Sequence, residues 1–503
     1  YIIKTQGNSI FVLGKTDIGS LFGTYELLTQ LFNYMIYATD TYRIDKDVKN
    51  LKLKNFDIID NPDFEERLAA WGNVYYDISK AHSLRFQLQY DEVYMNSSRA
   101  FHNTLELIDA KNNPAWIASN QKQLCYTAHG DSAEYERMVN AMFDAVKAII
   151  KKEPNKHIIT ITQEDNGSWC GCDTCKALFD AYGTDAVSQN IFINDVAEKV
   201  EEWLDEEDPT RDVLIATFAY YKTEKPPVIK NDDGTYSPID DNCILRDNVA
   251  ILYAGLGTLG YNHSIDDEVN SAVREILDGW KVCSSNFGVW NYQTHFNDYF
   301  MPYDTFTVSK EQYIKYLNMN CKWIFDQGQH NNRNSSNFNS LKLFLNSQWE
   351  WDVNRDYNTL VDDFFLNFYG KKDGALRQYY EELRTHLQLL DAKGLVGVRC
   401  SENGKNSDLW PLQLLRQWMS YIDKAYEEIE EYKESDPELY QKFYDHITLE
   451  SLTIRYMLIE FYIGYFPKDE QTRMKSSFKN DCLYLDVSQS KEGGTILDYT
   501  KGW

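Results

Sequence analysis

The chain has 503 residues, of which 43% are hydrophobic and 25% are charged, so its composition is that of a folded globular protein and excludes a disordered one. Asp and Glu outnumber Lys and Arg by 77 to 51, which leaves a formal net charge of −26. This charge argues against a nucleic-acid partner, because phosphate neutralisation needs clustered basic residues. No apolar run approaches the roughly 18 residues that a transmembrane helix needs.

Residues 1–58 are expected to form the end of a small α/β domain. SIFVLG predicts a strand, GSLFGTYELLTQLF repeats apolar residues at helical spacing, and YMIYAT predicts a second strand. A segment this short cannot bury a core alone, so it needs a neighbouring domain. The first residues show no basic stretch followed by an apolar one, so they do not reveal whether a signal peptide was removed.

Residues 59–355 alternate short apolar strand candidates with longer amphipathic segments. The eight candidates are RLAAWG (67–72), SLRFQL (83–88), NTLELI (103–108), HIITIT (157–162), VLIATFAY (213–220), VAILYAG (249–255), FGVWNY (287–292) and KWIFDQG (322–328). This alternation predicts parallel strands, and eight units predict an α/β fold of the (β/α)8 TIM-barrel type. An open doubly wound sheet is the competing fold, but it normally has a GxGxxG loop after an early strand, and the sequence contains none.

Residues 356–503 change to helical periodicity alone, with Leu376, Tyr380, Leu383 and Leu387 repeating at spacings of three and four. The segment therefore predicts an α-helical C-terminal domain whose apolar stripes pack on other parts of the chain.

The active site of a (β/α)8 barrel lies at the carboxyl ends of its strands. The fourth strand candidate ends in ITQED, which places Glu164 and Asp165 at the barrel mouth. Alternation along the strand directs Glu164 toward the barrel axis, whereas Asp165 begins the loop. Either residue is a candidate general acid. The alternative is that these carboxylates cap their own loop or accept hydrogen bonds from it.

Later strand ends supply further polar and aromatic side chains. Asp298 and Asp326 are the candidate partner carboxylates. The candidate sugar-binding residues are His102, Tyr220, Tyr253, Trp290, Tyr292 and His295. The aromatic content of 15% suits a cleft whose flat rings cover the apolar faces of sugars, but it suits a large aromatic core equally well.

Three of the nine cysteines cluster in WCGCDTC, as Cys170, Cys172 and Cys175. Nine cysteines in 503 residues are too few for a disulfide scaffold. Three alternatives stay open. The cluster can hold a structural zinc with Cys125 or a histidine as fourth ligand, form a local Cys170–Cys175 disulfide, or consist of reduced thiols that pack a loop. No organic cofactor is implied.

Several blocks of the sequence, in this order and spacing, resemble the bacterial family called domain of unknown function 4838. The blocks are FHNTLELIDAKNNPAWIAS, QLCYT, ITQEDNGSWCGCDTCKA, NDVAEKVEEWL, IATFAYYKTEKPP, VWNYQTHFNDYFMP and WIFDQG. The acidic residue followed by CxCxxC is the most specific motif. That family is grouped by likeness with the family 67 α-glucuronidases, which have an α/β N-terminal domain, a (β/α)8 barrel and a helical C-terminal domain.

The resemblance implies a glycoside hydrolase or a close relative of one. By strand order, Glu164 or Asp165 matches the position of the general acid in the α-glucuronidases. Those enzymes are similar to inverting hydrolases in which two more carboxylates act on water. No pair in this sequence clearly matches them, and Asp298 and Asp326 are the nearest substitutes.

We therefore expect an extracytoplasmic glycoside hydrolase that acts on an oligo- or polysaccharide, with acidic sugars among the options. A barrel that binds glycans without catalysis is the alternative. A metal-dependent hydrolase built on the cysteine cluster is a third option, although thiolate clusters more often form closed structural sites.

Overall fold

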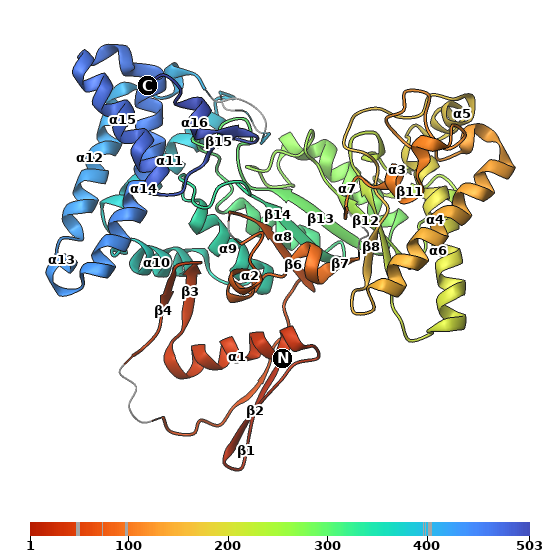
Figure 1. Cartoon of the computed structure of the whole chain (residues 1–503), viewed down its shortest axis with the longest axis horizontal. Coiled ribbons are helices and arrows are strands. Elements are labelled where there is room, and N and C mark those ends of the chain that lie inside the picture. The colour runs from red at the N-terminus through yellow and green to blue at the C-terminus, as the bar shows by residue number, and fades with distance from the viewer. Residues whose placement is uncertain (47–50, 73, 96–98, 396, 398, 401–404) are drawn as a thin grey trace.

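The computed structural model describes residues 1–46, 51–72, 74–95, 99–395, 397, 399–400 and 405–503. Its central feature is a curled, wholly parallel sheet of seven strands in the order β6-β14-β13-β12-β9-β8-β7 (Figure 1). The strands are β6 (Glu66–Ala70), β7 (Tyr94–Met95), β8 (Ile158–Thr160), β9 (Leu214–Ala219), β12 (Val249–Tyr253), β13 (Phe287–Tyr292) and β14 (Cys321–Gln327).

Alternating side chains of these strands enter two different cores. Ile158, Phe218 and Leu252 belong to a cluster enclosed by the curled sheet, whereas their neighbours Ile159 and Ile251 pack against the surrounding helices. Because both faces are covered, the strands are apolar almost throughout, as parallel sheets require.

The predicted α/β class is confirmed, but the full set of eight strands is not. The first strand, β6, pairs with the last, β14, as it does in a barrel. However, the second candidate (83–88) contributes a single bridge, between Gln87 and Leu68, to the neighbouring strand. The third candidate (103–108) was wrong, because residues Thr104–Leu107 form helix α3. Short apolar runs fit both periodicities, and packing decides between them.

Helices cover the outside of the sheet (Figure 1). They are α2 (Ile78–Ser83), α4 (Ser132–Lys152), α6 (Ala186–Glu207), α7 (Ser271–Cys283), α8 (Val308–Leu317) and α9 (Asn339–Trp351). Helix α5 (Asp173–Tyr182) packs on α6. A small hairpin of β10 (Val228–Lys230) and β11 (Tyr236–Pro238) packs beside α7. Within the described part of the chain, no helix combines the length and the apolar character that crossing a bilayer requires.

The N-terminal residues form a three-stranded antiparallel sheet, a helix and a hairpin. The elements are β1 (Ile2–Gln6), β2 (Ser9–Leu13), α1 (Asp17–Phe32), β3 (Met35–Ala38), β4 (Thr41–Arg43) and β5 (Asp57–Ile59). Their own apolar cluster, around Ile3 and Phe22, is completed by Trp351 at the end of α9. This small unit therefore depends on the central fold for its core.

The C-terminal residues form stacked helices on one side of the sheet (Figure 1). They are α10 (Tyr357–Phe368), α11 (Ala375–Asp391), α12 (Leu412–Glu428), α13 (Tyr432–Ser435), α14 (Pro437–Tyr462), α15 (Lys468–Tyr484) and α16 (Ile496–Tyr499). A short hairpin of β15 (Gln489–Lys491) and β16 (Gly494–Thr495), which the helical periodicity did not predict, accompanies these helices. The hairpin contacts the loop between β13 and α8, where the Tyr299 N–H donates to the Ser490 carbonyl at 2.8 Å.

Candidate functional site

A cavity of about 300 Å³ opens at the carboxyl ends of β9, β12, β13 and β14. This edge is where parallel α/β folds place their binding sites. The cavity is lined by His102, Asp165, Phe218, Tyr220, Ala254, Leu256, Trp290, Tyr292, Phe296, Asn297, Gln327 and Glu492. Five of the ten residues predicted for catalysis or sugar binding therefore meet in one place.

Asp165 is the predicted carboxylate that reaches this cavity. It follows β8 in the loop toward α5, and its side chain is open to solvent. Its Oδ1 accepts a hydrogen bond from the Tyr220 hydroxyl at 3.1 Å. Tyr220 itself is buried at the end of β9, so its phenol ring gives Asp165 a fixed neighbour.

Glu492 is the second carboxylate of the cavity, and the sequence did not predict it. It lies at the tip of the β15–β16 hairpin, where its backbone N–H donates to the Phe296 carbonyl at 3.0 Å. The residue as a whole is exposed, but its carboxyl group is partly desolvated by its surroundings. Desolvation first, and the negative charge of Asp165 second, raise the pKa of Glu492 above its usual value.

Aromatic rings form much of the remaining wall. Trp290 donates its indole N–H to Gln327 Oε1 at 2.9 Å, which holds the ring in place across two neighbouring strands. The ring packs edge-on against Phe325, with their centroids 4.5 Å apart. Tyr292, two residues further along β13, packs edge-on against Phe296. The wall therefore presents both ring surface and polar groups.

His102 has a backbone conformation that few residues adopt, with φ at 54°. Its backbone N–H donates to Thr162 Oγ1 at 2.8 Å, and its Nδ1 lies 2.8 Å from the Gln163 carbonyl oxygen. Because a carbonyl only accepts, Nδ1 is protonated in the neutral ring and Nε2 is left as an acceptor. Such conformations often occur at functional sites.

Glu164 does not line the cavity, although it precedes Asp165. Its Oε1 accepts from the Leu105 backbone N–H at 3.2 Å and lies 3.5 Å from the Thr104 hydroxyl, at the start of α3. Gln123 bonds to both the N–H and the carbonyl of Glu164. This is the loop-bonded arrangement that the sequence left open as the alternative.

The structure keeps the two predicted partner carboxylates away from the cavity. Asp298 is buried, and it accepts a hydrogen bond from Tyr456 of α14 while lying 3.8 Å from Lys405. Asp326 is fully buried among the helices, because its neighbour Phe325 takes the inward position on β14. There it accepts hydrogen bonds from Tyr313 and from Gln293. Both expectations of cavity carboxylates are therefore corrected.

Two predicted sugar-binding residues also lie elsewhere. Tyr253 faces the helix layer, and its hydroxyl is 3.3 Å from Glu224 Oε1. His295 is buried and lines a separate cavity with Trp410 and Asp304. Tyr253 points outward because strand alternation gives the inward positions to Leu252 and its partners.

The predicted cysteine cluster lies outside the cavity as well. Cys170, Cys172 and Cys175 are at the start of α5, and Cys125 joins them. All four are free thiols.

Comparison with known proteins identifies the family. The model of the family described as "Domain of unknown function (DUF4838)" matches residues 37–382. No curated protein matches the sequence. A solved structure that is similar is that of a "GH138 enzyme targeting pectin rhamnogalacturonan II", with 11% sequence identity and a TM-score of 0.38, over 96% of this chain and 68% of that one. Since the family model spans more than half of the sequence, the chain belongs to the DUF4838 family.

Proposed function

We propose that the protein is a glycoside hydrolase that cleaves a glycan in the cavity at the carboxyl edge of its parallel sheet. The observation that supports this most is the meeting of two carboxylates, Asp165 and Glu492, with the rings of Tyr220, Trp290 and Tyr292 in one cavity. A pair of carboxylates is what most glycosidases use to break the bond. Tyr and Trp combine an apolar ring with a hydroxyl or an indole N–H, which suits the mixed apolar and polar surface of a sugar.

Glu492 is the proposed general acid and Asp165 the proposed base or nucleophile. The raised pKa of Glu492 favours a carboxyl group that still holds its proton at working pH, and Asp165 is the other carboxylate that lines the cavity. Glu492 gives its proton to the glycosidic oxygen as the bond from that oxygen to the anomeric carbon breaks. In the inverting case, water attacks the anomeric carbon in the same step and gives its proton to Asp165. In the retaining case, Asp165 attacks that carbon as the bond breaks, and the ester so formed is then hydrolysed by a water molecule that gives its proton to Glu492.

The stereochemistry of the product separates these two roles for Asp165. Carboxyl groups about 6.5–9.5 Å apart leave room for water and give inversion, and groups about 5–5.5 Å apart give retention. Proton NMR of the first-formed product distinguishes the two outcomes.

A neutral sugar is the proposed occupant of the cavity. Among the described residues, those that line it include neither lysine nor arginine. A uronic acid would then face two carboxylates without a strong cation, which like-charge repulsion disfavours. The uronic-acid option raised by the sequence is therefore the weaker one.

The test is hydrolysis of a panel of aryl glycosides and natural glycans by the full chain. Asp165→Asn and Glu492→Gln are expected to lower kcat/KM about 100-fold or more, as removal of an acid–base group does. Glu434→Gln, at an exposed position on α13, serves as the matched control. Glu164→Gln separates the two adjacent carboxylates. A loss in Glu164→Gln that equals the loss in Asp165→Asn would contradict the assignment, and glycan binding without turnover would instead support a non-catalytic role.

A further inference from the structure

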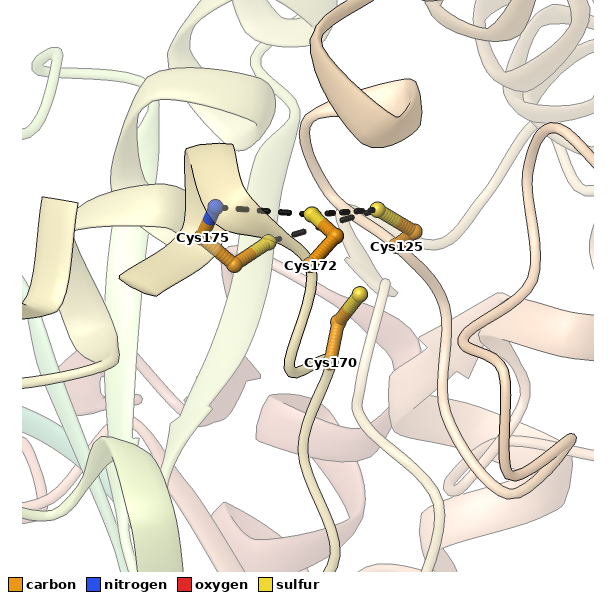
Figure 2. A group of neighbouring side chains, drawn as sticks. All are labelled: Cys125, Cys170, Cys172 and Cys175. Carbon is orange, nitrogen blue, oxygen red and sulfur yellow. Dashed lines mark hydrogen bonds between the residues drawn. The ribbon is translucent and has the colours of Figure 1, made fainter. Parts of the chain in front are cut away.

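Four cysteines from two separate segments of the chain meet beside α5 (Figure 2). Cys170, Cys172 and Cys175 come from the CxCxxC motif, and Cys125 comes from the loop that precedes α4. Their sulfur atoms all lie within 4.8 Å of one another. The Sγ of Cys125 is 3.9 Å from that of Cys172 and 4.0 Å from that of Cys175.

These separations match those between the ligands of a metal and not those of a disulfide. Zn–S bonds of about 2.3 Å in a tetrahedron place the sulfur atoms about 3.8 Å apart. A disulfide needs its sulfur atoms about 2.05 Å apart. The distances from Cys125 lie near the first value and far from the second.

Polar groups around the cluster contact three of its four sulfur atoms. Cys172 is the N-cap of α5, and its Sγ accepts from the Cys175 N–H at 3.5 Å. The His129 N–H points at Cys125 Sγ from 3.2 Å. The Thr127 hydroxyl lies 3.3 Å from the Sγ of Cys175. Groups directed at sulfur in this way are also found around metal-bound cysteines, where they orient the ligands.

Simple packing of reduced thiols does not account for this arrangement. The three buried cysteines form a small cluster of their own with Ala118, separate from the main core, and partly buried Cys172 packs against it. An apolar contact of this size does not need four sulfur atoms at mutual coordination distance, nor N–H groups directed at two of them.

We propose that Cys125, Cys170, Cys172 and Cys175 bind one zinc ion as a closed structural site. A tetrahedral set of four sulfur ligands selects zinc or iron, and a site whose four ligands all come from the protein leaves no open position for catalysis. Three of the four ligands are buried, and none of them lines the cavity described above.

The zinc would fasten the loop that carries Asp165, which lines the cavity, to the loop that contains Cys125. Gln123, two residues before Cys125, bonds to the backbone of Glu164 at 2.9 Å and 3.1 Å. Asn120 donates to the Trp169 carbonyl at 3.4 Å, directly before Cys170. Asp165 lies between these two connections. The site is therefore expected to hold the Asp165 loop in place.

The test measures metal in the full chain, purified without chelator and without a metal-affinity tag. Mass spectrometry of the elements is expected to find about one zinc per chain. Cobalt added to the metal-free protein is expected to give the intense visible bands of a tetrahedral thiolate site. Cys172→Ser, which changes the least buried ligand, is expected to lose the cobalt bands and most of the zinc. Cys283→Ser, a buried cysteine outside the cluster, should keep both.

Three outcomes would overturn the proposal. They are wild-type protein without stoichiometric metal, one iron per chain in place of zinc, or a disulfide between two of the four cysteines in alkylated peptides. The wild-type measurements decide the matter even if Cys172→Ser fails to fold. Since the readout is metal content, an inactive protein that holds zinc would count against the proposed hydrolase only.

Discussion

Tyr220 donates its phenol hydrogen to Oδ1 of Asp165 at 3.1 Å, which joins the end of β9 to the loop that follows β8. Asp165 follows β8 and Tyr220 follows β9, and these two strands pair in the parallel sheet, so the meeting of the two residues follows from strand order. The bond keeps the Asp165 side chain at the cavity.

Tyr220→Phe is expected to lower kcat/KM about tenfold, because the partly exposed carboxylate loses one charge-assisted hydrogen bond. The measurement is steady-state kinetics on the best substrate of the glycoside panel. Tyr182→Phe is the matched control, since Tyr182 donates in the same way to Asp240 at 2.5 Å on the surface. Equal losses in the two variants would show that the bond in the cavity has no special role.

The pH dependence of the reaction should report Glu492. A general acid must be protonated, so kcat/KM is expected to fall as pH rises through the pKa of Glu492, which burial and Asp165 raise above the usual range. Glu492→Gln should lose this alkaline limb. It should also keep more activity on aryl glycosides with good leaving groups than on natural glycans. If the limb persists unchanged in Glu492→Gln, another group is the acid.

The packing between β13 and β14 depends on a glycine in β13. A Cβ at Gly288 of β13 would overlap with the indole of Trp323, which is fully buried on the neighbouring strand. Gly288→Ala is therefore expected to lower the free energy of unfolding by about 1–3 kcal/mol, as overpacking does. Urea unfolding followed by circular dichroism measures the change. Gly257→Ala is the control, since no atom lies within 4 Å of its added Cβ. An unchanged free energy of unfolding in Gly288→Ala would contradict the expected overlap with Trp323.

The free energy of unfolding should fall with rising pH because of Glu450, a buried residue of α14. Its carboxyl group accepts from the Phe338 N–H and the Tyr369 hydroxyl, each at 2.8 Å. Burial raises its pKa to about 8. The folded state therefore holds a proton that the unfolded state releases near its ordinary pKa of about 4.3. The stabilisation is complete below that value and is lost as pH rises through about 8.

Glu450→Gln should flatten this part of the pH profile, since the amide cannot ionise and still offers an oxygen to the Phe338 N–H. Unfolding midpoints in urea between about pH 5 and pH 8.5 provide the measurement. Glu434→Gln, at an exposed position, should keep the wild-type slope. Parallel profiles for all three proteins would contradict the assignment.

Local patterns predicted much of the sheet and part of the cavity. Six of the eight strand candidates overlap strands of the sheet, because long apolar runs are typical of parallel strands covered on both faces. Asp165, Tyr220 and Trp290 were expected at one rim, and they line one cavity, since parallel strands end at the same edge. Asp326 was expected at the cavity but does not line it, because the buried ring of its neighbour Phe325 takes the inward position on β14.

The sequence by itself determined where six strands of the sheet run and which polar residues follow their ends. These properties depend on neighbours a few positions apart along the chain. Only the tertiary structure decided that Glu492, from a hairpin near the C-terminus, faces Asp165, and that Cys125 joins the CxCxxC motif. Contacts of this kind depend on how segments far apart in the sequence pack together. The periodicity of apolar residues within one segment carries no information about its distant partner.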